Sequence, residues 1–153
     1  MYARNNSVGV IGSGPVGKAL AKAFVATGYA VMIGSRSPEK LNDFVSANND
    51  TISAGSFVQT AQFGDIVVMA THGEATENAI DLSDPRNFGG KTVIDASNPL
   101  DISEGTLPTI LRTYAEVSLG ECVLGGIENA KWLEALVPHG LEQLVQQDNG
   151  TQC

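Results

Sequence analysis

Residues 8–40 read VGVIGSGPVGKALAKAFVATGYAVMIGSRSPEK, and this stretch decides the fold of the chain. An apolar run at Val8–Ile11 meets a glycine-rich turn at Gly12–Gly17, after which apolar residues recur at helical spacing until Gly28. A second apolar run, Tyr29–Ile33, follows at once. The order of strand, glycine turn, helix and strand predicts the first βαβ unit of a dinucleotide-binding fold.

The turn has the spacing GxGxxG, and each of its glycines has a mechanical purpose. Gly12 lets the chain turn sharply out of the strand, Gly14 lets the backbone approach a pyrophosphate, and Gly17 lets the helix pack close to the strand. Pro15 suits the first helical turn, and the helix N-terminus presents free N–H groups and partial positive charge to phosphates. Glycine-rich turns also occur for steric reasons alone, but the flanking strand and helix favour nucleotide binding.

The end of the second strand indicates which dinucleotide binds. NAD and FAD sites usually place Asp or Glu there to hold the ribose hydroxyls, whereas residues 34–40 read GSRSPEK. Ser35 can donate a hydrogen bond and Arg36 a planar fork to a 2′-phosphate, and Lys40 adds a further positive charge. This tip predicts NADP(H) rather than NAD, and it disfavours an S-adenosylmethionine enzyme. The alternative is that Arg36 and Lys40 are solvated surface charges.

The remaining sequence predicts an α/β fold. Further strands are expected at Thr51–Ala54, Asp65–Ala70 and Lys91–Ala96, and further helices at 38–48, Ser56–Gln62 and 71–82. Ser37 and Pro38 have the chemistry of a helix start, and Thr71 and Glu74 stand in capping-box order. These elements predict a three-layer, Rossmann-like, doubly wound parallel sheet of strand order 3-2-1-4-5, with an extra strand allowed and a helical segment at the C-terminus.

Two loops follow strands at the edge where open α/β sheets bind ligands. His72 comes directly after the fourth strand, and it either contacts a cofactor or substrate or is an exposed turn residue. Asn98 follows the fifth strand and offers a donor and an acceptor to a ring amide, unless it serves an Asx turn instead. Pro99 stiffens that loop. Because no serine and carboxylate beside His72 complete a relay, we assign no catalytic residue.

The composition narrows the expected partners. The chain has 153 residues, of which 42% are hydrophobic and 17% charged, and its net charge of −8 argues against nucleic acid or an anionic membrane as partner. The two cysteines, Cys122 and Cys153, have neither metal-ligand spacing nor a disulfide framework, so no metal site is expected. A short polar N-terminus and the lack of a membrane-length apolar run predict a soluble cytoplasmic protein.

The pattern changes near the C-terminus, which divides the chain into an expected NADP-binding Rossmann domain at 1–121 and a helical extension at 122–153. Apolar residues between Trp132 and Val145 fit helical spacing, interrupted at Pro138, and a polar tail that is expected to fray follows them. Such a helix either joins two copies into a homodimer or covers an open edge or face of the sheet.

Residues 8–40, the strand DIVVMAT at 65–71 and the segment VIDASNPL at 93–100 together resemble the NADP oxidoreductases that depend on the deazaflavin coenzyme F420. The resemblance covers residues 7–121. In that family a Rossmann domain binds NADP, and a hydride passes between the nicotinamide and the deazaflavin. Members usually continue past a further strand into segments that shape the deazaflavin pocket, whereas residues 126–140 do not read like the expected strand.

The resemblance implies a set of cofactor-binding residues at the ends of the strands. They are Gly12, Ser13, Gly14, Pro15, Val16 and Gly17 in the phosphate turn, Ser35, Arg36 and Lys40 around the 2′-phosphate, Ala70, Thr71 and His72 beside the nicotinamide, and Asn98 and Pro99 where the cleft closes.

Three functions follow from these observations. The first is an enzyme, an NADP(H)-dependent oxidoreductase that transfers a hydride to or from F420 or a similar small-molecule redox acceptor. The absence of a catalytic dyad does not argue against it, because the cofactors carry the reactive atoms. The second is a non-catalytic NADP(H)-binding or redox-sensing module, or a truncated relative. The third and least favoured is an imine, pyrroline carboxylate or ferric reductase.

Overall fold

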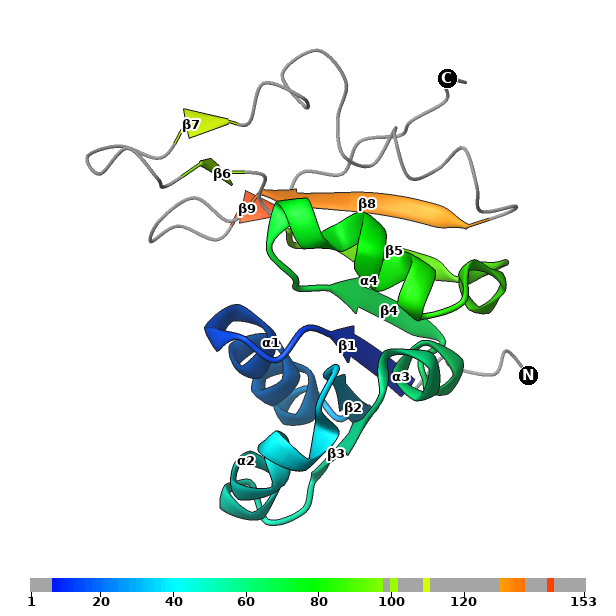
Figure 1. Ribbon diagram of the computed structural model, residues 1–153. Helices are drawn as coiled ribbons and strands as arrows, with labels where there is room; N and C mark the ends of the chain where they lie inside the picture. Colours follow the sequence, from blue (N-terminus) through cyan, green and yellow to red (C-terminus); the bar gives the residue numbers. More distant parts are fainter. Residues whose placement is uncertain (1–6, 98–99, 102–108, 111–129, 137–142, 145–153) are drawn as a thin grey trace.

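The computed structural model describes residues 7–97, 100–101, 109–110, 130–136 and 143–144, and within them a β-sheet carries helices on both faces (Figure 1). The strands of this sheet are β1 (Ser7–Ile11), β2 (Ala30–Gly34), β3 (Ile52–Gly55), β4 (Ile66–Met69), β5 (Thr92–Asp95), β8 (Lys131–Leu136) and β9 (Gln143–Leu144). A separate pair consists of β6 (Leu100–Asp101) and β7 (Thr109–Ile110). The helices are α1 (Pro15–Ala26), α2 (Asn42–Ala47), α3 (Phe57–Phe63) and α4 (Thr76–Leu82), with 3₁₀ turns η1 (Pro38–Leu41), η2 (Gly73–Ala75) and η3 (Pro85–Phe88).

The sheet has the order β3-β2-β1-β4-β5-β8-β9, so the predicted order 3-2-1-4-5 of the first five strands is confirmed. These five strands are parallel. The first strand is central, because Val8 pairs with Val31 of β2 on one side and with Ile66 of β4 on the other. Strands buried on both faces are rich in apolar residues, which explains the continuous runs in the sequence.

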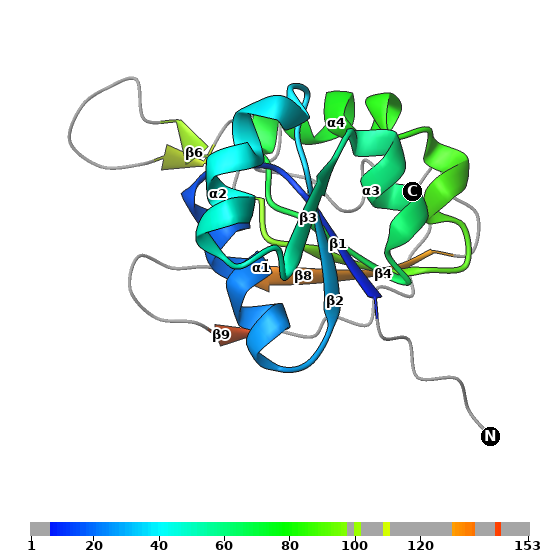
Figure 2. The ribbon, with the colours of Figure 1, turned by 90° about the horizontal axis from the view of Figure 1, so that it is seen from below.

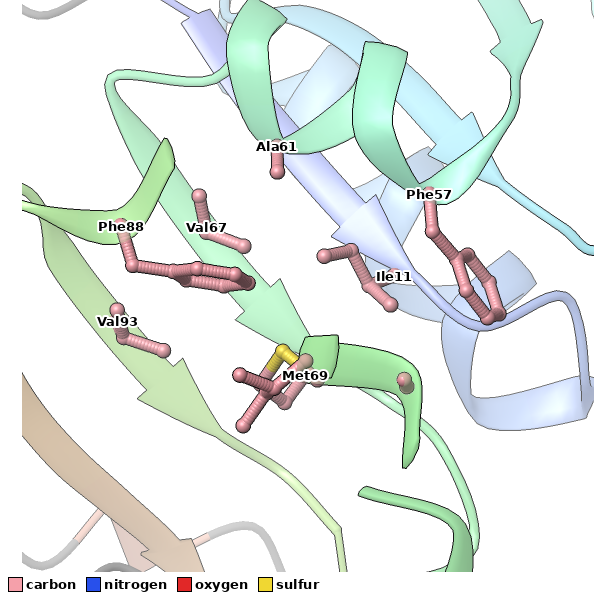
Figure 3. Close-up of a cluster of buried hydrophobic side chains, with 9 residues drawn as sticks. Ile11, Phe57, Ala61, Val67, Met69, Phe88 and Val93 are labelled. Carbon is pink, nitrogen blue, oxygen red and sulfur yellow. The ribbon is translucent and has the colours of Figure 1, made fainter. Parts of the chain in front are cut away.

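Each face of the sheet has its own hydrophobic cluster. The side chains of β1 alternate between the two clusters, so Val8 and Val10 join the cluster that includes Ala21 of α1, while Ile11 joins the one that includes Ala61 of α3. Figure 2 shows α1 and α2 on one side of the sheet and α3 and α4 on the other. Figure 3 shows the second cluster, in which the fully buried ring of Phe88 lies among strand side chains.

The third helix lies very close to the sheet. A Cβ placed on Gly9 of β1 would overlap the carbonyl oxygen of Thr60, and one placed on Gly34 of β2 would lie 2.7 Å from the Thr60 hydroxyl oxygen. These glycines therefore allow α3 to approach the two strands. A capping box fixes its start, because the Ser56 hydroxyl accepts the Gln59 N–H at 3.2 Å and the Gln59 side chain accepts the Ser56 N–H at 2.9 Å.

Two other helix starts differ from the sequence prediction. The helix expected from residue 71 begins as η2 and continues as α4. The capping box predicted at Thr71 is wrong, because the cap position is His72, whose side chain makes no capping hydrogen bond. The helix expected after Pro38 begins as η1 and continues as α2, and the Ser37 side chain makes no capping hydrogen bond. Both helices begin as 3₁₀ turns, which are frequent at helix N-termini and are wound more tightly than an α-helix.

The helical segment predicted near the C-terminus is wrong for Lys131–Leu136, which forms β8. This strand pairs in parallel with β5, with Thr92 opposite Lys131, and the Lys131 N–H donates to the Lys91 carbonyl at 2.9 Å. The free edge of β5 offers a row of unpaired backbone groups, and pairing with that edge outweighs a helical spacing of apolar residues. The expected domain boundary at residue 121 and both cysteines lie outside the described residues. Within the described part of the chain, no helix combines the length and apolar character needed to cross a membrane.

Candidate dinucleotide site at the carboxyl ends of the strands

At two positions of the turn after β1, the packing and backbone conformation of the protein require glycine. Gly12 has φ of +124°, and a Cβ on it would lie 2.6 Å from the carbonyl carbon of Ala70. A Cβ on Gly17 would overlap the carbonyl oxygen of Gly12. Side chains are thus excluded at both positions by the turn and by the neighbouring strand, as the sequence predicted for a sharp turn and a close helix.

The middle glycine has no such requirement. Gly14 has φ of −74° and ψ of −178°, a conformation open to any residue, and a Cβ on it would meet nothing within 4 Å among the described residues. It is exposed and precedes α1, whose first residue is Pro15 and whose first turn holds neither an acidic residue nor a side-chain cap. The open space in front of this helix end is therefore where an anion can approach the backbone.

The end of β2 lies against the glycine turn. The Gly12 N–H donates to the Gly34 carbonyl at 3.1 Å, and the Ser13 hydroxyl donates to the Ser35 hydroxyl oxygen at 3.4 Å. The same Ser35 oxygen accepts the Ser37 N–H at 3.1 Å. Both lone pairs of this oxygen are thereby engaged, which leaves the Ser35 proton as a donor for an anion.

The two cations predicted beside Ser35 are exposed. Neither Arg36 nor Lys40 forms an ion pair with any residue that the structure describes. Their charges are thus available to a ligand, and the same observation fits the alternative of solvated surface charges. The structure brings Ser13 and Ser35 together and places Arg36 directly after them.

The end of β4 lies on the other side of the turn. The Ala70 N–H donates to the Ile11 carbonyl at 2.8 Å, and Ala70 is 9% exposed. Thr71 is half-buried, and its hydroxyl oxygen lies 2.9 Å from that of Thr76 at the start of α4. His72 is exposed. Of the residues predicted beside the nicotinamide, Ala70 is thus buried against β1, next to the phosphate turn, while His72 is open to solvent.

The end of β5 contains a residue that the sequence prediction missed. Asp95 is 3% exposed, and its Oδ1 accepts the Ser97 N–H at 2.8 Å and the Ser97 hydroxyl at 2.5 Å. The Ala96 N–H donates to the Met69 carbonyl at 2.8 Å, which ties this segment to β4. An Asp two residues before a Ser is the signal of an Asx turn that could have found it. The predicted Asn98 and Pro99 lie outside the described residues.

Comparison with known proteins agrees with this arrangement. A family model described as NADP oxidoreductase coenzyme F420-dependent matches residues 7–99. Among solved structures, a protein from Arthrobacter sp. FB24 that is provisionally described as an F420-dependent NADP reductase is 30% identical with a TM-score of 0.76. That match covers 86% of this chain and 61% of the other.

Two curated relatives are similar to the chain over part of their length. Over 140 residues the chain is 26% identical to the decarboxylating 6-phosphogluconate dehydrogenase of Chlamydia muridarum, a match that covers 87% of this chain and 29% of the enzyme. Over 103 residues it is 35% identical to the metalloreductase STEAP2 of Homo sapiens, covering 67% of this chain and 20% of that protein. The chain therefore spans less than a third of the length of these curated relatives.

Proposed function

Because the chain belongs to the NADP oxidoreductase coenzyme F420-dependent family, we propose that it binds NADP(H) along the carboxyl ends of β2, β1, β4 and β5 and exchanges a hydride with the deazaflavin F420. The observation that carries the proposal is Gly14. Nothing in the described protein excludes a side chain there, although the other two glycines of the turn are sterically required. A ligand that approaches the backbone in front of α1 supplies the missing reason.

Each part of the dinucleotide lies at the end of a different strand or helix. The pyrophosphate lies at the N-terminus of α1, where backbone N–H groups and the helix dipole favour negative charge. The 2′-phosphate lies at the end of β2, where it meets the Ser35 hydroxyl, the Arg36 guanidinium and the Lys40 ammonium. The nicotinamide half then extends over the ends of β4 and β5, on the other side of the turn.

When bound, the nicotinamide supplies the ring carbon that accepts or gives the hydride. The residues of the chain bind the dinucleotide and orient its nicotinamide ring. They hold the phosphates at one end of the site, and the ends of β4 and β5 limit where the ring can lie. Such a reaction needs no acid–base pair from the protein, because the cofactors carry the reactive atoms.

The first experiment is a titration of NADPH and NADH into the wild type and Arg36→Ala, followed by nicotinamide fluorescence. Loss of a charged hydrogen bond to the 2′-phosphate should weaken NADPH about tenfold to a hundredfold and leave NADH unchanged. The matched control is Arg86→Ala, since Arg86 is exposed, pairs with Asp84, and precedes the amino end of β5. That variant should bind NADPH as the wild type does. Equal loss for both nucleotides in Arg36→Ala, or no binding by the wild type, would contradict the proposal.

The second experiment identifies the redox partner. Turnover of NADPH is followed with F420, free flavin, ferric chelates and a cyclic imine as alternative acceptors. We expect the highest kcat/KM with F420. Turnover with ferric chelates alone would instead favour a reaction like that of the metalloreductases to which the chain is similar. Binding of NADPH without turnover on any acceptor would favour a non-catalytic NADP(H)-binding module.

A further inference from the structure

Two threonine hydroxyls meet at the end of β4. The hydroxyl oxygens of Thr71 and Thr76 lie 2.9 Å apart, and Thr76 donates to the carbonyl of His72 at 3.4 Å. Thr76 is fully buried, whereas Thr71 is half-buried. A buried polar side chain next to a partly exposed one is a common way to hold a ligand-facing group in a fixed orientation.

The pair lies on the side of the glycine turn that faces away from β2. Thr71 directly follows Ala70, whose N–H bonds to β1, and a Cβ on Gly12 would lie 3.1 Å from the Thr71 nitrogen. The 2′-phosphate groups lie on the β2 side, so a dinucleotide whose pyrophosphate meets the turn extends its nicotinamide half toward Thr71. This placement rests on the proposed function.

Proton counting links the roles of the two hydroxyls, either of which can donate to the other. A hydroxyl carries one proton and two lone pairs, and the His72 carbonyl can only accept. If Thr76 gives its proton to His72, then Thr71 must donate to Thr76 for both contacts to be hydrogen bonds. The lone pairs of the Thr71 oxygen are then left for a donor. The carboxamide NH₂ of nicotinamide is a donor of the right kind.

We propose that the Thr71 hydroxyl oxygen accepts a hydrogen bond from the nicotinamide carboxamide, and that Thr76 is the positioning residue that orients it. The pair thereby selects the carboxamide ring of the dinucleotide at the end of β4. Thr76 itself touches no ligand and acts through Thr71.

The test compares three ligands that share the phosphate end. They are NADP⁺, the acetylpyridine analogue of NADP⁺, which keeps the carbonyl but has no N–H, and 2′,5′-ADP, which has no nicotinamide. The wild type should bind NADP⁺ about threefold to tenfold more tightly than the acetylpyridine analogue, as one neutral hydrogen bond allows. Thr71→Val and Thr76→Val should abolish that preference and leave the affinity for 2′,5′-ADP unchanged.

Matched variants separate positioning from structural damage. Thr76→Ser keeps the hydroxyl and should restore the preference for NADP⁺. Thr60→Val removes another fully buried threonine hydroxyl that bonds to a carbonyl four residues earlier, at 2.7 Å, and should keep the preference. If Thr76→Val does not fold, Thr71→Val still decides the matter, because Thr71 is only half-buried.

The outcomes distinguish the two claims. An unchanged preference for NADP⁺ in both valine variants, with 2′,5′-ADP still bound, overturns the inference and leaves the proposed function standing. A wild type that binds neither NADP⁺ nor 2′,5′-ADP overturns both. A preference that is lost together with the affinity for 2′,5′-ADP shows a general structural effect and also counts against the roles assigned to the two threonines.

Discussion

The three glycines of the turn after β1 occupy their positions for different reasons, and substitutions can separate these reasons. Gly12 is held in the left-handed region and Gly17 abuts the Gly12 carbonyl, so both belong to the folded chain itself. Gly14 has an ordinary conformation, and a Cβ on it would meet none of the described residues within 4 Å. Stability and binding therefore respond to different members of the same motif.

Gly14→Ala should leave the melting temperature close to that of the wild type and weaken NADPH strongly, because the added Cβ occupies the approach of the pyrophosphate. Gly12→Ala should lower stability by at least about 1–2 kcal/mol, since its φ of +124° is unfavourable for alanine and its Cβ meets Ala70. Thermal unfolding and an NADPH titration on both variants give the comparison. Wild-type affinity in Gly14→Ala would remove the main support for the nucleotide site.

For single residues, the sequence predicted where the glycine turn lies better than it predicted the hydrogen bonds between side chains. The GxGxxG spacing located the turn, because the positive φ of Gly12 and the contact of Gly17 with the Gly12 carbonyl both arise within a few residues of the chain. The Asx turn of Asp95 was missed although its signal, an Asp two residues before a Ser, is local. The Ser13–Ser35 hydrogen bond was not predicted, since it depends on which strands become neighbours. The capping box at Thr71 failed because the helix begins one residue later, as a 3₁₀ turn with His72 at the cap, and the Thr71 hydroxyl lies beside that of Thr76.

Among the elements, α3 receives support at its C-terminus from a distant lysine. The Lys91 ammonium donates to the Ala61 carbonyl at 2.7 Å and reaches the Gln62 carbonyl at 3.4 Å, both in the last turn of α3. These carbonyls have no partner within the helix. Burial lowers the pKa of the Lys91 ammonium below its ordinary value, and the charge of Asp65 offsets part of this effect.

This pKa shift has a definite sign in the stability of the protein. Between the lowered pKa of Lys91 and its ordinary value, the unfolded state binds more protons, so the free energy of unfolding gains a contribution that rises with pH. Urea unfolding at several alkaline pH values should show this rise in the wild type and not in Lys91→Met. Lys131→Met is the control, because Lys131 is exposed, and it should keep the rise. Identical pH profiles for the wild type and Lys91→Met would refute the assignment.

Element types were predicted well for the first five strands and poorly for β8, which lies between β5 and β9 in the sheet. The strand at Ile66–Met69 is a continuous apolar run, as expected of a strand in a parallel sheet that is covered on both faces, and Val67, Val68 and Met69 are indeed buried. The segment Lys131–Leu136 has a spacing that also suits a helix, and the choice was made by the unpaired edge of β5, which no local pattern reveals.

For the whole molecule, stability should depend on the cluster that joins α3, α4 and η3 to the sheet. Phe88 is 0% exposed and lies among Val67, Met69 and Val93 (Figure 3). Phe88→Ala should lower the free energy of unfolding by about 3–5 kcal/mol, a large part of the total of a typical domain. Leu82→Ala removes a side chain that is 46% exposed and should cost far less. Denaturant unfolding of both variants measures the difference, and equal losses would show that Phe88 is not a centre of the core.

The central position of β1 in the sheet has a consequence for folding during synthesis. Its partner β2 follows after one helix, but its other partner, β4, comes only after β3 and α3. The hydrogen bond that the Ser7 hydroxyl donates to the Asp65 carboxylate at 2.5 Å therefore cannot form before the chain has reached β4. During synthesis β1 thus emerges with both edges unpaired, and after β2 has paired with it the other edge stays unpaired until β4 emerges. For that interval the middle of the future sheet is an open template for other chains, so translation speed between β2 and β4 should govern the yield of correctly folded protein.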